Sequence, residues 1–136
     1  MIDRGALHPR IRIIFLLLVL VQGLHSLEEY IGRLWESFPP ASILCSLISD
    51  DLETGFLIIN SGLFVFGILC WLMPVRRGHW IASGLIWFWI GVELINGIGH
   101  PVWTIMQRSY TPGVATAPIL LVLAIVLSGY MSVRRS

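Results

Sequence analysis

The chain has 136 residues, of which 56% are hydrophobic and 12% are charged. A soluble domain has about 25% charged residues, so this composition indicates a membrane protein that forms one compact unit. The net charge of +1 argues against a nucleic-acid partner and leaves the lipid bilayer as the expected one. We expect the two cysteines, Cys45 and Cys70, to lie too far apart for a disulfide.

A short basic segment at residues 1–12 leads into a first apolar run at about residues 11–31. As a helix this run would be ~30 Å long, enough to cross a bilayer. A signal peptide is the alternative, but no small-x-small cleavage site follows. Pro39-Pro40 then stops a helix, and the apolar patch in residues 34–52 is too short to span, so we expect an interfacial or re-entrant segment there.

Three more apolar runs follow, at about residues 54–73, 79–100 and 114–131. A tight basic turn separates the first two, and a loop at residues 101–113 precedes the last. We therefore predict an all-α fold, an integral membrane four-helix bundle in a single domain over residues 1–136.

The arginines predict how this bundle lies in the cell membrane. Three lie near the N-terminus, two in the turn after the second run and two at the C-terminus, whereas the other side has only Arg33 and Arg108. Positively charged loops stay in the cytoplasm, so we expect a multi-pass protein with both termini cytoplasmic.

Polar side chains occur at one predicted depth in three of the four runs. His25, Glu28 and Glu29 lie at i, i+3 and i+4 and share a helix face. Counted along ideal helices, His25, Asn60 and Glu93 each lie ~20 Å from the cytoplasmic side. Polar groups inside a bilayer face the bundle interior and pair there. We predict one site made of His25, Glu28, Glu29, Glu93, Asn96 and His100, supported by Asn60 and Tyr110.

A structural role is the alternative for several of these residues. Asn60 and Asn96 would then be interhelical hydrogen-bonding groups, and Glu93 would pair with an arginine such as Arg33.

The same residues carry a family resemblance. His25-Ser-Leu-Glu28-Glu29 resembles the naming motif of the HXXEE-motif membrane proteins, and Asn96-Gly-Ile-Gly-His100 is similar to their Asn-x-x-x-His signature. Tyr110-Thr-Pro112-Gly113, Thr116-Ala117, Asn60 and Phe38-Pro39 also fit the family's pattern. The resemblance implies a small multi-span membrane protein and implies no activity.

Two chemistries fit the predicted site. One is acid–base work on a lipid-like small molecule, with Glu93 as the protonated carboxyl, Glu28 or Glu29 as the ionised one, and His25 and His100 relaying protons. The other is binding of a divalent metal ion as cofactor by His25, Glu28, Glu29, Glu93 and His100. With either chemistry, the hypothesis we favour is a membrane-embedded enzyme whose His/Glu/Asn site lies in the outer half of the bilayer.

Three alternatives remain. A proton or metal-ion transporter would need a homodimer, since one four-span protomer is small for a pore. A non-catalytic membrane assembly partner is the second. Glu28-Glu29-x-x-x-Arg33 is also similar to the first motif of CAAX-type intramembrane proteases, although their Phe-x-x-x-His motif is missing here.

Overall fold

The computed structural model describes residues 7–133, which form helices joined by turns and loops, with no strand among them. The fold is therefore all-α, as the sequence predicts. In chain order the elements are α1 (Pro9–Ile31), α2 (Leu34–Ser37), α3 (Pro39–Ser46), α4 (Leu52–Cys70), the π-helical turn η1 (Trp71–Val75), α5 (Ala82–Gln107) and α6 (Ala117–Val133).

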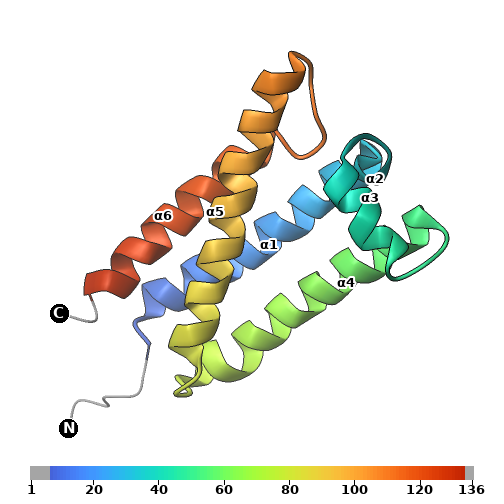
Figure 1. Cartoon of the computed structure of the whole chain (residues 1–136). Helices are drawn as coiled ribbons and strands as arrows, with labels where there is room; N and C mark the ends of the chain where they lie inside the picture. The colour runs from blue at the N-terminus through green and yellow to red at the C-terminus, as the bar shows by residue number, and fades with distance from the viewer. Residues whose placement is uncertain (1–6, 134–136) are drawn as a thin grey trace, which may run out of the picture.

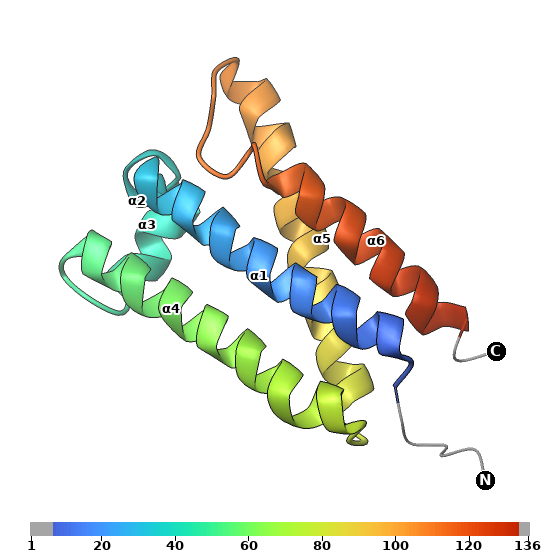
Figure 2. The same ribbon diagram turned by 180° about the vertical axis from the view of Figure 1, so that it is seen from behind.

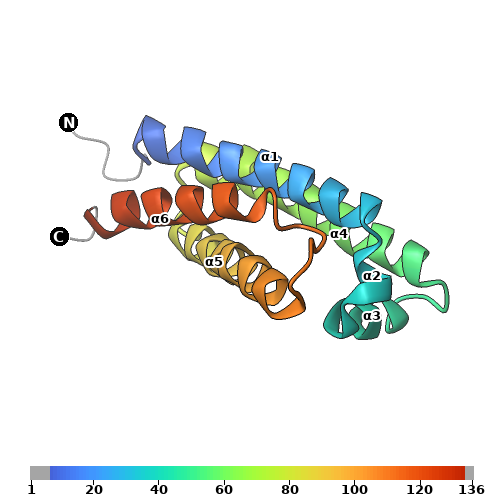
Figure 3. The same ribbon diagram turned by 90° about the horizontal axis from the view of Figure 1, so that it is seen from above.

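The long helices α1, α4, α5 and α6 lie side by side, with α5 crossing the other three at an angle (Figures 1 and 2). Helix α1 packs directly against α4 and α6, and α5 packs against α6. Side chains bridge the wider space between α1 and α5, as where Phe15 meets Trp89 edge-on at a centroid distance of 6.4 Å. The short helices α2 and α3 sit at one end, beside the end of α1 and the start of α4 (Figure 3).

Three helices are long and apolar enough to cross a membrane: Pro9–Ile31, Leu52–Val75 and Ala82–Gln107. Helix α6 is apolar too, but at 17 residues it is shorter. Three of the four predicted spans thus meet both criteria of length and composition.

The predicted end of the third run is wrong. Helix α5 continues from His100 through Pro101 to Gln107, into the segment expected to be a loop. Proline inside a helix removes one backbone hydrogen bond. The extension nevertheless packs on Phe38, the residue that joins α2 to α3: the Trp103 and Phe38 rings lie 4.6 Å apart, and this tertiary contact offsets the loss.

The expected interfacial segment consists of α2 and α3. Pro39 occupies the first turn of α3, where the missing N–H of proline costs nothing. Pro39-Pro40 therefore begins a helix as well as ending one. Cys45 lies on α3 and Cys70 at the end of α4, and both are free and buried.

Helix α1 has two opposite faces of unusual composition. From Ile13 to Ile31 its outward stripe is exposed and apolar, with Leu24 at 58% and Ile31 at 74% exposure. Its inward stripe is apolar in the first half and polar in the second, where Gln22, His25 and Glu29 are buried. A helix that exposes leucines and buries charged groups is suited to lipid rather than water.

The apolar core packs around the first half of α1. It joins Ile11, Phe15, Leu18 and Val19 to buried residues of α4, η1, α5 and α6. Side chains of α1 and α6 meet at this end, where Arg10 donates to the hydroxyl of Tyr130 at 3.4 Å. The start of α1 and the end of α6 thus lie at the same end of the molecule (Figure 1).

Candidate functional site

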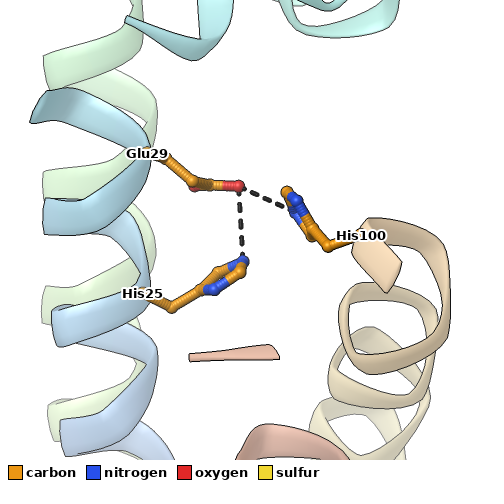
Figure 4. Close-up of side chains that lie close together, drawn as sticks. All are labelled: His25, Glu29 and His100. Carbon is orange, nitrogen blue, oxygen red and sulfur yellow. Dashed lines mark ion pairs between the residues drawn. The ribbon is translucent and has the colours of Figure 1, made fainter. Parts of the chain in front are cut away.

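Three buried side chains from two helices meet in the polar half of the structure. The Glu29 Oε1 atom lies 3.3 Å from His25 Nε2 and 3.1 Å from His100 Nε2 (Figure 4). The two imidazole rings are edge-on, with their centroids 4.7 Å apart. His25 and Glu29 are one helical turn apart on α1, while His100 lies on α5. We call this set the His–Glu–His cluster.

The loop before α6 closes over the two histidines. Gly113 has φ of +94°, and a Cβ atom there would lie 2.6 Å from His100 Nδ1 and 2.8 Å from His25 Cε1. Only glycine combines this backbone conformation with so close an approach. The hydroxyl of Thr116, three residues further on, lies 2.7 Å from His25 Nδ1.

Glu28 turns away from the cluster and binds this loop. Its carboxylate accepts hydrogen bonds from the Thr116 hydroxyl at 2.6 Å, from the backbone N–H groups of Ala115 and Thr116 at 3.0 Å, and from the Tyr110 hydroxyl at 2.6 Å. These N–H groups immediately precede α6, so Glu28 ties the entry of α6 to α1. Glu28 and Tyr110 therefore hold the loop in place, and Glu28 lies outside the His–Glu–His cluster.

The hydrogen bond to Glu28 also acts on Tyr110 itself. A phenol beside a carboxylate loses its proton less readily, and this contact raises the pKa of Tyr110 to about 12.

Glu93 belongs to a second group of polar side chains. It is fully buried, and its Oε2 accepts from Asn96 Nδ2 at 3.2 Å. In the amide orientation that satisfies its neighbours, Gln22 donates to the two Glu93 oxygens at 3.1 and 2.9 Å. Arg33, the arginine that sequence alone suggested as a partner of Glu93, instead pairs with Glu36 at 2.6 Å.

The second group continues to α4. Gln22 also contacts the Ser26 hydroxyl at 3.2 Å, and Ser26 donates to Asn60 Oδ1 at 2.8 Å. Asn60 in turn donates to the carbonyl of Phe56 at 3.1 Å. This amide chain therefore links α5, α1 and α4 across the structure.

A cavity of about 240 Å³ lies between the two groups. Its polar wall contains Glu29, His100, Gln22, Asn96 and Asn60, and its apolar wall comes largely from α3 and α4. Glu93 does not line the cavity. It accepts hydrogen bonds from the Gln22 and Asn96 amides, which do. The cavity brings one face of the His–Glu–His cluster within reach of a small polar group.

The structure thus divides the predicted residues among three settings. It brings His25, Glu29 and His100 together, places Glu93, Asn96 and Asn60 in the amide chain, and places Glu28 and Tyr110 on the loop. Sequence reasoning missed Gln22, which lies inside an apolar run and precedes His25 by three residues, a signal that was available. It also named Gly113 and Thr116 only as residues that fit the family's pattern.

Comparison with known proteins gives a family and nothing more specific. The family described as "Protein of unknown function with HXXEE motif" matches residues 15–127, which include the cluster, the amide chain and the loop. No curated protein and no solved structure matches the chain. With His25 and Glu29 as the first and last residues of the motif that names it, this chain belongs to the HXXEE-motif family.

Proposed function

We propose that this chain is a membrane-embedded enzyme in which the His–Glu–His cluster holds a divalent metal ion and acts on a lipid-like substrate. The observation that carries the proposal is the convergence of three ligand-type atoms. One from each of His25, Glu29 and His100 lies within 4.8 Å of the other two, and all three residues are buried.

The spacing of these atoms suits zinc. Ligands about 2.05 Å from a tetrahedral ion lie about 3.3 Å from one another. The two distances to Glu29 Oε1, 3.3 and 3.1 Å, match this separation. Two histidines and one glutamate leave one position open, which is the ligand set of several catalytic zinc sites.

Hydrogen bonding around His25 also favours a cation. The Thr116 hydroxyl donates its proton to Glu28, so its oxygen accepts from His25 Nδ1. A neutral His25 then carries its hydrogen on Nδ1 and directs the lone pair of Nε2 at the Glu29 carboxylate. His25 Nε2 makes no hydrogen bond within residues 7–133, and two electron-rich atoms that face each other are stabilised by a positive charge between them.

Each surrounding group then has one task. Thr116 and Glu28 orient the His25 ring, as a carboxylate often does behind a metal-binding histidine. Gln22 and Asn96 line the cavity and offer hydrogen bonds to a polar head group, while Glu93 positions these two amides. A bound zinc ion would supply a Lewis acid and an acidic bound water.

Metal-free acid–base chemistry at the same residues is the second candidate. The observation in its favour is that both histidines approach one carboxylate oxygen at hydrogen-bonding distance. A proton on either ring would satisfy the lone pair of His25 as a metal ion does. Transport is less well supported, because the apolar core fills the space toward the start of α1 and offers no polar path among the described residues.

Metal analysis of the purified protein tests the proposal. We expect stoichiometric zinc in the wild type after dialysis, and loss of it in Glu29→Gln and His100→Ala. His79→Ala is the matched control, because His79 is an exposed histidine at the turn after η1. A folded wild type that binds no divalent ion would overturn the metal site and leave acid–base chemistry.

The same proposal includes a four-span bundle in the cell membrane with both termini cytoplasmic. It is supported by the exposed apolar stripes and by the common end of α1 and α6, since a chain that starts and ends on one side needs an even number of crossings. Reporter fusions after Arg77 and Arg135 should read as cytoplasmic, and a fusion near Asp50 as extracytoplasmic. The reverse at Asp50 would contradict this topology.

A further inference from the structure

A larger apolar furrow runs between α1 and α4, with a volume of about 810 Å³. Its walls are formed largely by aliphatic and aromatic side chains at helical spacing, among them Leu20, Leu24 and Leu27 on α1 and Leu57, Phe64 and Val65 on α4. Leu24, Leu27 and Leu57 are 58, 52 and 44% exposed, so the furrow is open on the outward side of both helices.

The furrow is long enough for a hydrocarbon chain. It extends from Leu20 to Tyr30, which is ~15 Å along α1. At one end Gly23 meets the Phe64 ring, where a Cβ atom would be only 2.8 Å from the ring. At the other end the Tyr30 hydroxyl donates to Glu53 at 2.7 Å and bridges the two helices. An open apolar furrow of this length, parallel to two apolar helices, can take up an extended hydrocarbon chain.

One hydrogen-bonded pair interrupts the apolar lining. Ser26 and Asn60 both line the furrow, and they are bonded to each other at 2.8 Å. Asn60 and Phe56 also line the inner cavity that contains Glu29 and His100. Asn60 and Phe56 therefore form the wall that the furrow and the cavity share.

We infer that the furrow binds the single hydrocarbon chain of the substrate and that Ser26 and Asn60 receive a hydroxyl or carbonyl group at its head. This inference rests on the proposed function, because it gives the His–Glu–His cluster a substrate class: single-chain lipids that enter sideways from the bilayer. A head group that replaces the Ser26–Asn60 hydrogen bond opens the shared wall toward the cluster. Ser26 and Asn60 thus provide the hydrogen-bonding groups for the head group in an otherwise apolar furrow.

Photolabelling of the purified full chain in lipid nanodiscs tests this inference. The probe is a long-chain fatty alcohol with a diazirine in its chain, and the labelled positions are read by mass spectrometry. We expect label on furrow residues such as Leu24 and Leu57. Ser61→Trp, which fills the furrow from α4, should lower that label several-fold.

Gly62→Trp is the matched control. Gly62 is the next residue on α4, it is exposed, and a Cβ atom built there meets nothing within 4 Å. It should leave the furrow label unchanged. Leu27→Trp blocks the furrow from α1 and replaces Ser61→Trp if that variant fails to fold, which circular dichroism shows. Label spread evenly over all outward residues of α1 and α4, or equal label in the blocked and control variants, would overturn the inference.

A second probe isolates the polar pair. The same diazirine hydrocarbon without a hydroxyl should label the furrow several-fold less than the alcohol, and Asn60→Leu should remove this difference. An alcohol and a hydrocarbon that label the wild type equally would overturn the role of Ser26 and Asn60.

Metal content separates this inference from the function on which it rests. Ser61→Trp should retain its zinc, because Ser61 lies outside the cavity and the cluster. Zinc without furrow labelling refutes the lipid site alone, whereas furrow labelling without zinc refutes the metal site alone.

Discussion

The two halves of α1 bury opposite kinds of side chain. The first half presents Ile11, Phe15, Leu18 and Val19 to the apolar core, and the second presents Gln22, His25 and Glu29 to the site. Both halves expose leucines and isoleucines on the outward face. Packing in the first half therefore stabilises the fold, while the polar groups of the second half need partners and, in the proposed function, hold the metal ion. Substitutions in the two halves should have separable effects.

The largest effect on stability is expected from Phe15→Ala. Phe15 is fully buried against Trp89, and deleting a buried aromatic ring costs about 3 kcal/mol through lost contacts and the cavity left behind. Zinc bound per folded molecule should not change. Thermal unfolding in detergent and metal analysis of the folded fraction measure the two quantities. A proportional loss of both would mean that the halves are not separable.

The first half of α1 was also the easier half to predict from sequence. The apolar runs and their lengths predicted the long helices. The predicted end of α5 was wrong, because the packing of Trp103 on Phe38 outweighs the local effect of Pro101. In the site, Glu28 and Glu29 are neighbours in sequence. Which one faces the histidines and which faces the loop depends on where α6 begins, and no local pattern contains that information.

The next largest effect is expected from Thr116→Val, which should lower the metal affinity because it removes the hydroxyl between His25 and Glu28. Losing such a partner of a metal-binding histidine typically lowers affinity 10–100-fold, or about 1.4–2.7 kcal/mol. Zinc titration against a competing chelator measures the change. Thr116→Ser retains the hydroxyl and should stay near the wild type, and a similar loss in both variants would show that the hydroxyl is not the cause.

Gly113→Ala should cost about 2 kcal/mol, because alanine is strained at φ of +94° and its methyl group would overlap both imidazole rings. The stability loss should be accompanied by weaker zinc binding, since the rings must move. Gly129→Ala, on α6 with nothing within 4 Å of the added atom, is the control. Unchanged zinc affinity in Gly113→Ala would mean that the loop does not position the histidines.

A smaller effect is expected from Glu93→Gln, within about 1 kcal/mol, because glutamine has the size of glutamate and keeps one of the two oxygens that accept hydrogen bonds from Gln22 and Asn96. Zinc should be retained, since Glu93 contacts the Gln22 and Asn96 amides rather than the cluster. Its effect should add to that of Glu28→Gln, because the two carboxylates share no hydrogen-bond partner. Loss of zinc in Glu93→Gln would instead restore the single five-residue site that the sequence suggested.

The smallest effect is expected from Tyr110→Phe, which removes one of the hydrogen bonds that Glu28 accepts from the loop. Tyr110 is 64% exposed, so the cost should be about 0.5 kcal/mol at neutral pH.

The pKa of Tyr110 in the folded protein, about 12, lies above the ordinary value near 10. A group whose folded pKa is raised contributes its stability below the unfolded pKa and loses it as the pH rises through the folded one. The stability difference between wild type and Tyr110→Phe should therefore be constant up to about pH 10 and vanish by about pH 12. Ultraviolet titration of the tyrosines should show, in parallel, a high-pH step that Tyr110→Phe lacks. A difference that persists above pH 12 would mean that the Tyr110 hydroxyl stabilises the fold through a contact other than its hydrogen bond to Glu28.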